Sequence, residues 1–173
     1  CDPTREKLKK LYNESDVFLY TSREEGWGLT PLEAMASGCV VVGTNTGCML
    51  DIGVNGENVL LSEPNEPVGL YENIEKITIS TWIKSKLIEQ MHTTDIPIVY
   101  DGLDIDVFHN KKTEYYNGKN ELKILMLYHN LSKKGVEDGL LAYDMLKAKN
   151  LNVKLSMFGL DRNPKIPSDV TYY

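Results

Sequence analysis

Residues 22–38 read Ser22-Arg-Glu-Glu-Gly-Trp-Gly-Leu-Thr-Pro-Leu-Glu-Ala-Met-Ala-Ser-Gly38, and the rest of the fold can be worked out from this segment. Thr30 and Pro31 predict the start of a helix, with a hydroxyl at the N-cap and a proline at the first helical position. Gly38 predicts its end, because glycine adopts a left-handed conformation at low cost. The preceding run, Val17-Phe-Leu-Tyr20, is apolar and predicts a buried strand.

Two carboxylates, Glu25 and Glu33, stand on this segment with seven residues between them. A strand, a glycine loop and the exposed N–H groups of a helix start form a natural seat for a phosphate. Carboxylates beside such a seat suit sugar hydroxyls, so the chemistry favours a sugar phosphate or a nucleotide sugar. The same residues also allow two simpler interpretations, in which the glutamates have structural or solvent-exposed roles. Thr30 and Glu33 also form a capping box, which does not exclude ligand contact, and Glu24 and Glu25 are equally consistent with solvated loop charges.

Strand and helix signals alternate along the whole chain. Apolar runs predict strands at residues 17–20, 40–42, 58–61, 77–80, 123–128, 153–158 and 170–173. Amphipathic or capped runs predict helices that begin near Asp2 and Thr30, and further helices at residues 68–76, 82–90 and 136–147. The polar residues 110–120 predict a loop. This alternation predicts an α/β fold of the Rossmann type, a parallel sheet with helices on both faces.

Size and composition narrow the class of protein. At 173 residues the chain can form one domain with its own core. Its 42% hydrophobic and 25% charged residues are typical of a soluble globular protein, and the net charge of −6 argues against nucleic acid as the main partner. No apolar run approaches the roughly 20 residues that span a bilayer, and no signal peptide is recognised. The three cysteines and three histidines show no metal-ligand spacing, so we expect a cytoplasmic protein without metal or cofactor.

Three segments carry a resemblance to a known family. The run Glu25-Gly-Trp-Gly-Leu-Thr-Pro-Leu-Glu33 resembles the Glu-x7-Glu signature of retaining glycosyltransferases of the GT-B fold, family 4. The run Leu127-Tyr-His-Asn-Leu-Ser-Lys-Lys-Gly135 resembles their phosphate-binding strand and loop, which ends in Lys-Gly. Residues 96–108 resemble their interdomain linker. Trp27, the Lys-Lys-Gly loop and Phe158-Gly159 are most similar to transferases of the rhamnan-synthesis type.

The resemblance implies a role for each matching residue. Glu25 would accept hydrogen bonds from hydroxyls of the donor sugar, and Glu33 would hold the ribose hydroxyls of the nucleotide. Lys134 would neutralise the charge that grows on the leaving diphosphate, with Lys133 as its solvated neighbour. Further contacts to the donor are implied for five positions: Gly28, Leu29, Thr30, Gly47 and Gly102.

Some positions depart from the family pattern. Many relatives have an arginine a few residues before the lysine, where this chain has His129-Asn130-Leu131. The second cation for the phosphates is therefore missing or comes from elsewhere. Tyr172 and Tyr173 lie where the base is expected, although a core or surface role for these tyrosines is at least as consistent. None of the histidines is assigned to catalysis.

The order of the segments also differs from the family. Relatives carry the linker and the Lys-Gly loop before the Glu-x7-Glu segment, so the family order would be residues 77–173 followed by residues 1–76. We interpret the chain as a single nucleotide-sugar-binding domain that is circularly permuted, with a junction near Lys76–Ile77. The sequence does not distinguish a natural permutation from an engineered one.

The family also has an N-terminal domain that binds the glycan acceptor, and only residues 77–90 resemble part of it. We therefore expect the chain to bind a nucleotide sugar but to transfer sugar poorly by itself. Loss of that domain would expose an apolar face, so a homodimer is a further expectation.

The leading interpretation is the donor-binding domain of a glycosyltransferase of polysaccharide biosynthesis. The rhamnan-type resemblance suggests a dTDP-rhamnose donor, although relatives that use UDP or GDP sugars share the signature. The alternative is a non-catalytic, permuted or truncated domain that serves as a folding or assembly scaffold, and a sugar-nucleotide epimerase is a third candidate. A dinucleotide-dependent oxidoreductase is disfavoured, because Gly26-Trp-Gly28 is followed by Pro31 rather than by the third glycine of Gly-x-Gly-x-x-Gly.

Overall fold

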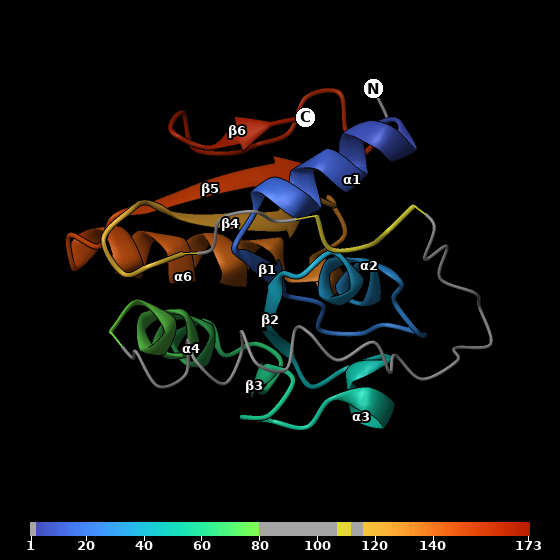
Figure 1. Cartoon of the computed structure of the whole chain (residues 1–173), viewed down its shortest axis with the longest axis horizontal. Coiled ribbons are helices and arrows are strands. Elements are labelled where there is room, and N and C mark those ends of the chain that lie inside the picture. The colour runs from blue at the N-terminus through green and yellow to red at the C-terminus, as the bar shows by residue number, and fades with distance from the viewer. Residues whose placement is uncertain (1–2, 80–106, 112–115) are drawn as a thin grey trace.

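The computed structural model of the chain describes residues 3–79, 107–111 and 116–173 (Figure 1). In chain order the elements are α1 (Arg5–Glu14), β1 (Val17–Tyr20), α2 (Thr30–Ala36), β2 (Val40–Thr44), α3 (Met49–Ile52), β3 (Leu60–Ser62), α4 (Pro67–Ile79), β4 (Leu122–Leu127), the 3-10 turn η1 (Ser132–Lys134), α6 (Val136–Ala148), β5 (Val153–Phe158) and β6 (Thr171–Tyr172). The strands form one parallel sheet in the order β3-β2-β1-β4-β5-β6. The predicted α/β fold of the Rossmann type is confirmed.

Strand β1 lies in the middle of the sheet. Its first residue, Val17, is in register with Val40 of β2 on one side and with Ile124 of β4 on the other. All four residues of β1 are buried, as expected for a parallel strand with both faces covered. Alternate side chains enter two different cores, because successive residues of a strand point to opposite faces.

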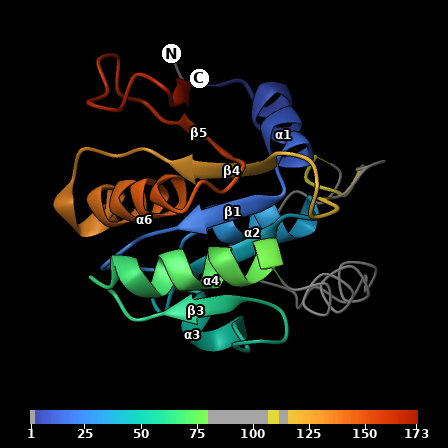
Figure 2. The ribbon, with the colours of Figure 1, turned by 90° about the vertical axis from the view of Figure 1, so that its left-hand side faces the viewer.

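The helices divide between these two faces, as Figure 2 shows. Helices α4 and α6 cover one face, where Leu70 and Leu146 pack with Val17 in the first core. Helices α1 and α2 cover the other, where Tyr12 and Leu32 pack in the second core. The sheet is thus enclosed by helices on both sides, and its strand ends remain available for a site.

One predicted strand is wrong. Residues 77–80 were expected to be extended, but α4 continues to Ile79. Leu70, Ile74 and Ile77 recur at helical spacing and are all buried against the sheet, which makes one continuous apolar face. The β-branched residues at 77–79 favour a strand locally, but this tertiary packing outweighs that preference. The junction predicted near Lys76–Ile77 therefore falls inside a helix.

The remaining predictions differ in their outcomes. The strands at 17–20, 40–42, 123–128, 153–158 and 170–173 are confirmed within one or two residues, and the strand predicted at 58–61 begins at Leu60. The short helix α3 was not predicted, because its four residues carry no repeating pattern. The helix predicted at 82–90 lies outside the described residues. Across the ranges that the structure describes, no helix is both long and apolar enough to cross a bilayer.

Candidate functional site

The candidate site lies at the carboxyl ends of β1 and β4. From β1 the chain winds outward through β2 to β3, whereas from β4 it winds the opposite way through β5 to β6. In open parallel sheets, ligands bind in the crevice where the winding direction reverses. The loops that follow β1 and β4 therefore meet at the position where this fold offers a binding site.

An ion pair joins these two loops. The Lys134 ammonium contacts Oε2 of Glu25, although the two residues are 109 positions apart in the sequence. Both side chains are mostly shielded, with exposed fractions of 18% and 19%. Ser22 Oγ lies 3.3 Å from the same carboxylate oxygen, and Thr21 Oγ1 donates to the Lys134 carbonyl at 2.9 Å. Lys133 is exposed, in agreement with its predicted role as a solvated neighbour.

A second charged contact fixes the same loops. The backbone N–H groups of Arg23 and Glu24 donate to the Lys133 carbonyl at 2.7 and 3.1 Å. The Arg23 guanidinium forms two hydrogen bonds to the buried carboxylate of Asp138 on α6, at 2.8 and 2.9 Å. These hydrogen bonds raise the pKa of Arg23. Arg23 therefore fastens the β1 loop to α6 and does not supply the second phosphate cation in this arrangement.

Two of the three glycines predicted for the site, Gly28 and Gly47, are required by its close packing. Gly28 and Gly47 both have positive φ, +85° and +56°. A Cβ atom at Gly47 would lie 2.4 Å from the Trp27 carbonyl oxygen and 3.0 Å from Cγ of Glu25. Cys48 N donates to that carbonyl at 2.6 Å, so the loop after β2 is pressed against the loop after β1. Gly47 is thus brought beside Glu25.

The start of α2 differs from the prediction. The N-cap position is occupied by Leu29, not Thr30, and no side chain caps the helix. The capping box expected for Thr30 and Glu33 is therefore wrong, because the Glu33 carboxylate is engaged elsewhere. The N–H groups of Gly28, Leu29 and Thr30 have no acceptor within the described part of the chain, as is usual at a helix start. The predicted helix end is confirmed, since Gly38 has φ +81°.

Glu33 is held from the core by Tyr12. The Tyr12 hydroxyl, on α1, donates to Glu33 Oε2 at 3.0 Å, and Tyr12 has no exposed surface. Burial raises the pKa of Glu33, while the Tyr12 hydrogen bond and the charge of Arg5 lower it, so that the net shift is upward. The pKa of Tyr12 is raised by burial and by Glu33, which keeps the phenol protonated as the donor. The second carboxylate oxygen of Glu33 has no hydrogen-bond partner among the residues described.

Other predicted positions lie apart from this group or outside the described residues. Gly102 is one of the latter, so its predicted contact to the donor stays a prediction. The Tyr172 ring packs edge-on against Tyr128 with centroids 5.8 Å apart, which is a packing role. The Lys7 ammonium lies 5.0 Å from the Tyr173 ring centroid at the start of α1.

Cavities lie at the ends and at one edge of the sheet among the described residues. One, of about 520 Å³, is bounded by the loop after β4, by α6 and by the β5–β6 loop, and His129 is part of its wall. His129 Nδ1 accepts from the Leu131 N–H at 3.1 Å, so this histidine organises its own loop.

In the parts of the chain described, no group of acidic, histidine or cysteine side chains is arranged to hold a metal ion.

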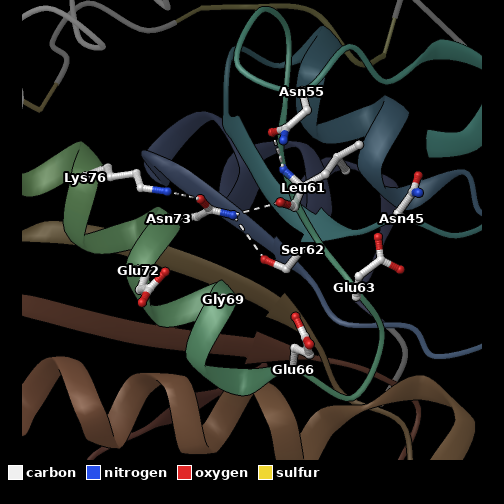
Figure 3. Close-up of a pocket in the computed structure, with 10 residues that line it drawn as sticks. All are labelled: Asn45, Asn55, Leu61, Ser62, Glu63, Glu66, Gly69, Glu72, Asn73 and Lys76. Atoms are coloured by element: carbon white, nitrogen blue, oxygen red, sulfur yellow. Dashed lines mark hydrogen bonds between the residues drawn. The ribbon is translucent and has the colours of Figure 1, made fainter.

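The second cavity, of about 370 Å³, lies over the edge strand β3, and Figure 3 shows the residues that line it. Its wall carries three carboxylates, Glu63, Glu66 and Glu72, against one ammonium, Lys76. A diphosphate would be repelled by that charge balance. The pairing of lysine with glycine loops at the ends of β1 and β4 suits an anion better.

Two residues that hold the site in place, Tyr12 and Arg23, were not predicted from the sequence. Nothing in the spacing of Tyr12 indicates that its hydroxyl meets Glu33. Arg23 was not singled out, because its partner Asp138 lies 115 residues away. Each could have been found only from the three-dimensional arrangement.

Comparison with known proteins identifies the relatives of this sequence. The sequence pattern of the family described as "Glycosyl transferases group 1" matches residues 2–93. A lipopolysaccharide core biosynthesis mannosyltransferase of Rhizobium leguminosarum bv. viciae is 44% identical over 50 residues, which is 29% of this chain and 14% of that protein. A capsular polysaccharide biosynthesis glycosyltransferase of Staphylococcus aureus is 35% identical over 67 residues, 39% of this chain and 18% of that protein.

An uncharacterized glycosyltransferase of Methanocaldococcus jannaschii is 33% identical over 75 residues, 43% of this chain and 19% of that protein. The matches thus span only 14% to 19% of the length of these three relatives. No solved structure matches the chain significantly.

Proposed function

The chain belongs to the group 1 glycosyltransferases, and from that membership we propose that it binds a nucleotide-diphosphate sugar for transfer to a glycan acceptor. The proposal concerns the donor side of the reaction. Relatives named for lipopolysaccharide core and capsular polysaccharide biosynthesis support an acceptor that is a growing surface polysaccharide.

The observation that carries the proposal is the meeting of Glu25 and Lys134 at the reversal point of the sheet. An ammonium has three donors, so Lys134 can contact a phosphate oxygen while Glu25 holds it in place. Negative charge grows on the diphosphate as the bond to the sugar breaks. A fixed cation beside the leaving oxygen stabilises that charge by about 3 kcal/mol for a good contact.

The start of α2 supplies the complementary contacts. The N–H groups of Gly28, Leu29 and Thr30 lie at the start of α2 and have no acceptor among the described residues, and the partial positive charge there favours an anion. Glu25 would accept hydrogen bonds from hydroxyls of the donor sugar. Glu33, one α-helical turn into α2, would accept hydrogen bonds from the ribose.

The acceptor would bind at the same end of the sheet, where the strands have their carboxyl ends. Leu29, Leu131 and Leu160 follow β1, β4 and β5 respectively, and 39%, 48% and 72% of their surfaces are exposed. Exposed apolar side chains in loops at the same end of a parallel sheet favour a surface that a partner covers. In the proposed enzyme this partner is the acceptor-binding domain, so we expect the chain alone to bind the donor and to transfer little sugar.

Calorimetric titration with dTDP, UDP and GDP tests the proposal. We expect saturable binding of at least one nucleotide, with the preferred base indicating the donor, and dTDP favoured by a rhamnosyl donor. The Glu33→Ala variant is expected to bind at least about tenfold more weakly, since a hydrogen bond to a charged group is worth about 1.5–3 kcal/mol. Absence of binding to all three nucleotides would leave a non-catalytic scaffold as the better account.

A further inference from the structure

Tyr12 is a buried polar side chain that the proposed reaction does not use. Its ring lies in the second core, edge-on to Phe18, Phe108 and Phe158 with centroids 5.6 to 5.9 Å away. Such a site selects an aromatic ring, and phenylalanine would satisfy it. The hydroxyl needs a further explanation, because a buried hydroxyl is costly unless it is hydrogen-bonded.

The hydroxyl is directed at Glu33. It donates to Oε2 across a gap between α1 and α2, from a ring that the three phenylalanines hold in place. The second oxygen of Glu33 has no hydrogen-bond partner among the described residues and is the oxygen left for a ligand. One oxygen is thus anchored to the core, which restricts the orientation of the carboxylate.

We propose that Tyr12 is a positioning residue that orients the Glu33 carboxylate to accept hydrogen bonds from the ribose of the nucleotide. The inference rests on the proposed function, because it requires Glu33 to contact the nucleotide. A carboxylate held before the ligand arrives loses less conformational freedom on binding, which increases affinity. Tyr12 does not itself touch the nucleotide.

The same contact bears on the charge of Glu33. Two groups lower its pKa, the Tyr12 hydroxyl and the guanidinium of Arg5, both on α1, while burial raises it. Removal of the hydroxyl leaves burial opposed only by Arg5, so Glu33 protonates at higher pH. A protonated Glu33 can no longer accept with both oxygens, and nucleotide binding is lost on the acid side.

The test is a double-mutant cycle on nucleoside diphosphate binding, followed by calorimetry from pH 4 to pH 8. Tyr12→Phe is expected to weaken binding about fivefold to tenfold at pH 7, the effect of one hydrogen bond, and to move the acid midpoint to higher pH. Glu33→Gln is expected to weaken binding and to remove the acid midpoint. The double variant should bind no more weakly than Glu33→Gln alone, because Tyr12 acts only through Glu33.

Tyr143→Phe is the matched control. Tyr143 is also a buried tyrosine whose hydroxyl faces a carboxylate, Asp169 at 3.5 Å, but it lies on α6 away from Glu33. This variant should bind nucleotide as the native protein does. An equal loss in Tyr143→Phe and Tyr12→Phe would overturn the inference, since the loss would then reflect general loosening.

Two failures can be told apart. If Glu33→Gln weakens binding but Tyr12→Phe changes neither the affinity nor the acid midpoint, the positioning role is wrong and the proposed function stands. If Glu33→Gln binds like the native protein, Glu33 does not contact the nucleotide and the inference is wrong, although nucleotide binding itself stands. If the native protein binds no nucleoside diphosphate, the proposed function is wrong. Should Tyr12→Phe fail to fold, NMR of the Tyr12 hydroxyl proton in the native protein decides the question. A slowly exchanging hydroxyl proton that stays hydrogen-bonded to Glu33 when nucleotide binds supports the inference, and a freely exchanging one overturns it.

Discussion

At the scale of a single residue, the pKa of Glu33 is subject to opposing effects, burial on one side and its contacts with Tyr12 and Arg5 on the other. Its carboxylate is partly buried beside Tyr12, and burial raises its pKa more than Tyr12 and Arg5 lower it. The charged form that would bind a ribose is therefore the form that the folded protein disfavours. Strained or poorly solvated groups of this kind are typical of binding sites, where function outweighs stability.

This imbalance predicts how stability depends on pH. Because the pKa of Glu33 is higher in the folded than in the unfolded chain, its contribution is fully present below the unfolded value of about 4.3. It is lost as pH rises through the folded pKa. Glu33→Gln cannot ionise, so its free energy of unfolding relative to the native protein should rise with pH over this window. Urea denaturation between pH 3.5 and pH 8 measures the difference, and a relative stability that falls as pH rises would contradict the account.

At the scale of elements, contacts between segments distant in sequence fix the site loops. Arg23 joins the β1 loop to α6, and Asp138 is only 5% exposed. At the opposite edge of the sheet, Asn55 and Asn73 close the free side of β3, as Figure 3 shows. Asn55 accepts from the Leu61 N–H and Asn73 donates to its carbonyl, so the edge strand offers little to another chain.

Removal of the Arg23 side chain is expected to destabilise the protein. Arg23→Ala leaves a buried Asp138 carboxylate without its bidentate partner, at a cost of about 2–3 kcal/mol in the free energy of unfolding. Chemical denaturation at pH 7 measures this change. Arg162→Ala, at an exposed arginine, is the control and should change stability by less than about 0.5 kcal/mol. Equal effects of the two variants would show that the Arg23 contact contributes nothing specific.

A second element-scale prediction concerns the edge strand. Asn73 is 6% exposed and donates to both the Leu61 carbonyl and Ser62 Oγ, at 3.1 and 3.0 Å. Asn73→Ala is expected to lower the free energy of unfolding by about 1–3 kcal/mol, because these acceptors lose their donor. Lys76→Ala removes only the exposed partner of Asn73 and should change stability by less than about 0.5 kcal/mol. If Asn73→Ala is as stable as Lys76→Ala, the asparagine does not hold the strand edge.

At the scale of the whole molecule, the sheet order is the same whichever half of the chain comes first. Strands β1 to β3 follow one another from the centre of the sheet to one edge, and strands β4 to β6 follow one another from the centre to the other edge. Either set could come first in the chain and give this sheet. The Lys7 ammonium at the start of α1 lies 5.0 Å from the Tyr173 ring, so the two ends of the described chain are neighbours. The sheet is therefore compatible with either order of the two halves, and the junction expected near Lys76–Ile77 lies inside helix α4 and inside the family match over residues 2–93.

The sequence predicted those parts of the fold whose signal is local. The run Val17–Tyr20 is continuously apolar, and apolar residues alternate with Lys154 and Ser156 in Val153–Phe158, so both could be assigned to strands without knowledge of the fold. Residues 77–79 could not, because their helical state depends on packing against the sheet. The family resemblance assigned Glu25 and Lys134 to one donor site, whereas their ion pair and the Tyr12 and Arg23 contacts depend on tertiary geometry.

In the proposed donor site, Lys134 holds the diphosphate of a nucleotide sugar beside Glu25. The most direct measurement compares Lys134→Ala with Lys133→Ala in calorimetric titrations with the nucleoside diphosphate that binds the native protein. The two variants remove the same charge from adjacent positions, one paired at the site and one exposed. We expect Lys134→Ala to lose roughly tenfold or more in affinity for the nucleoside diphosphate, and Lys133→Ala to lose almost none. Equal losses, or no loss in either variant, would contradict this expectation.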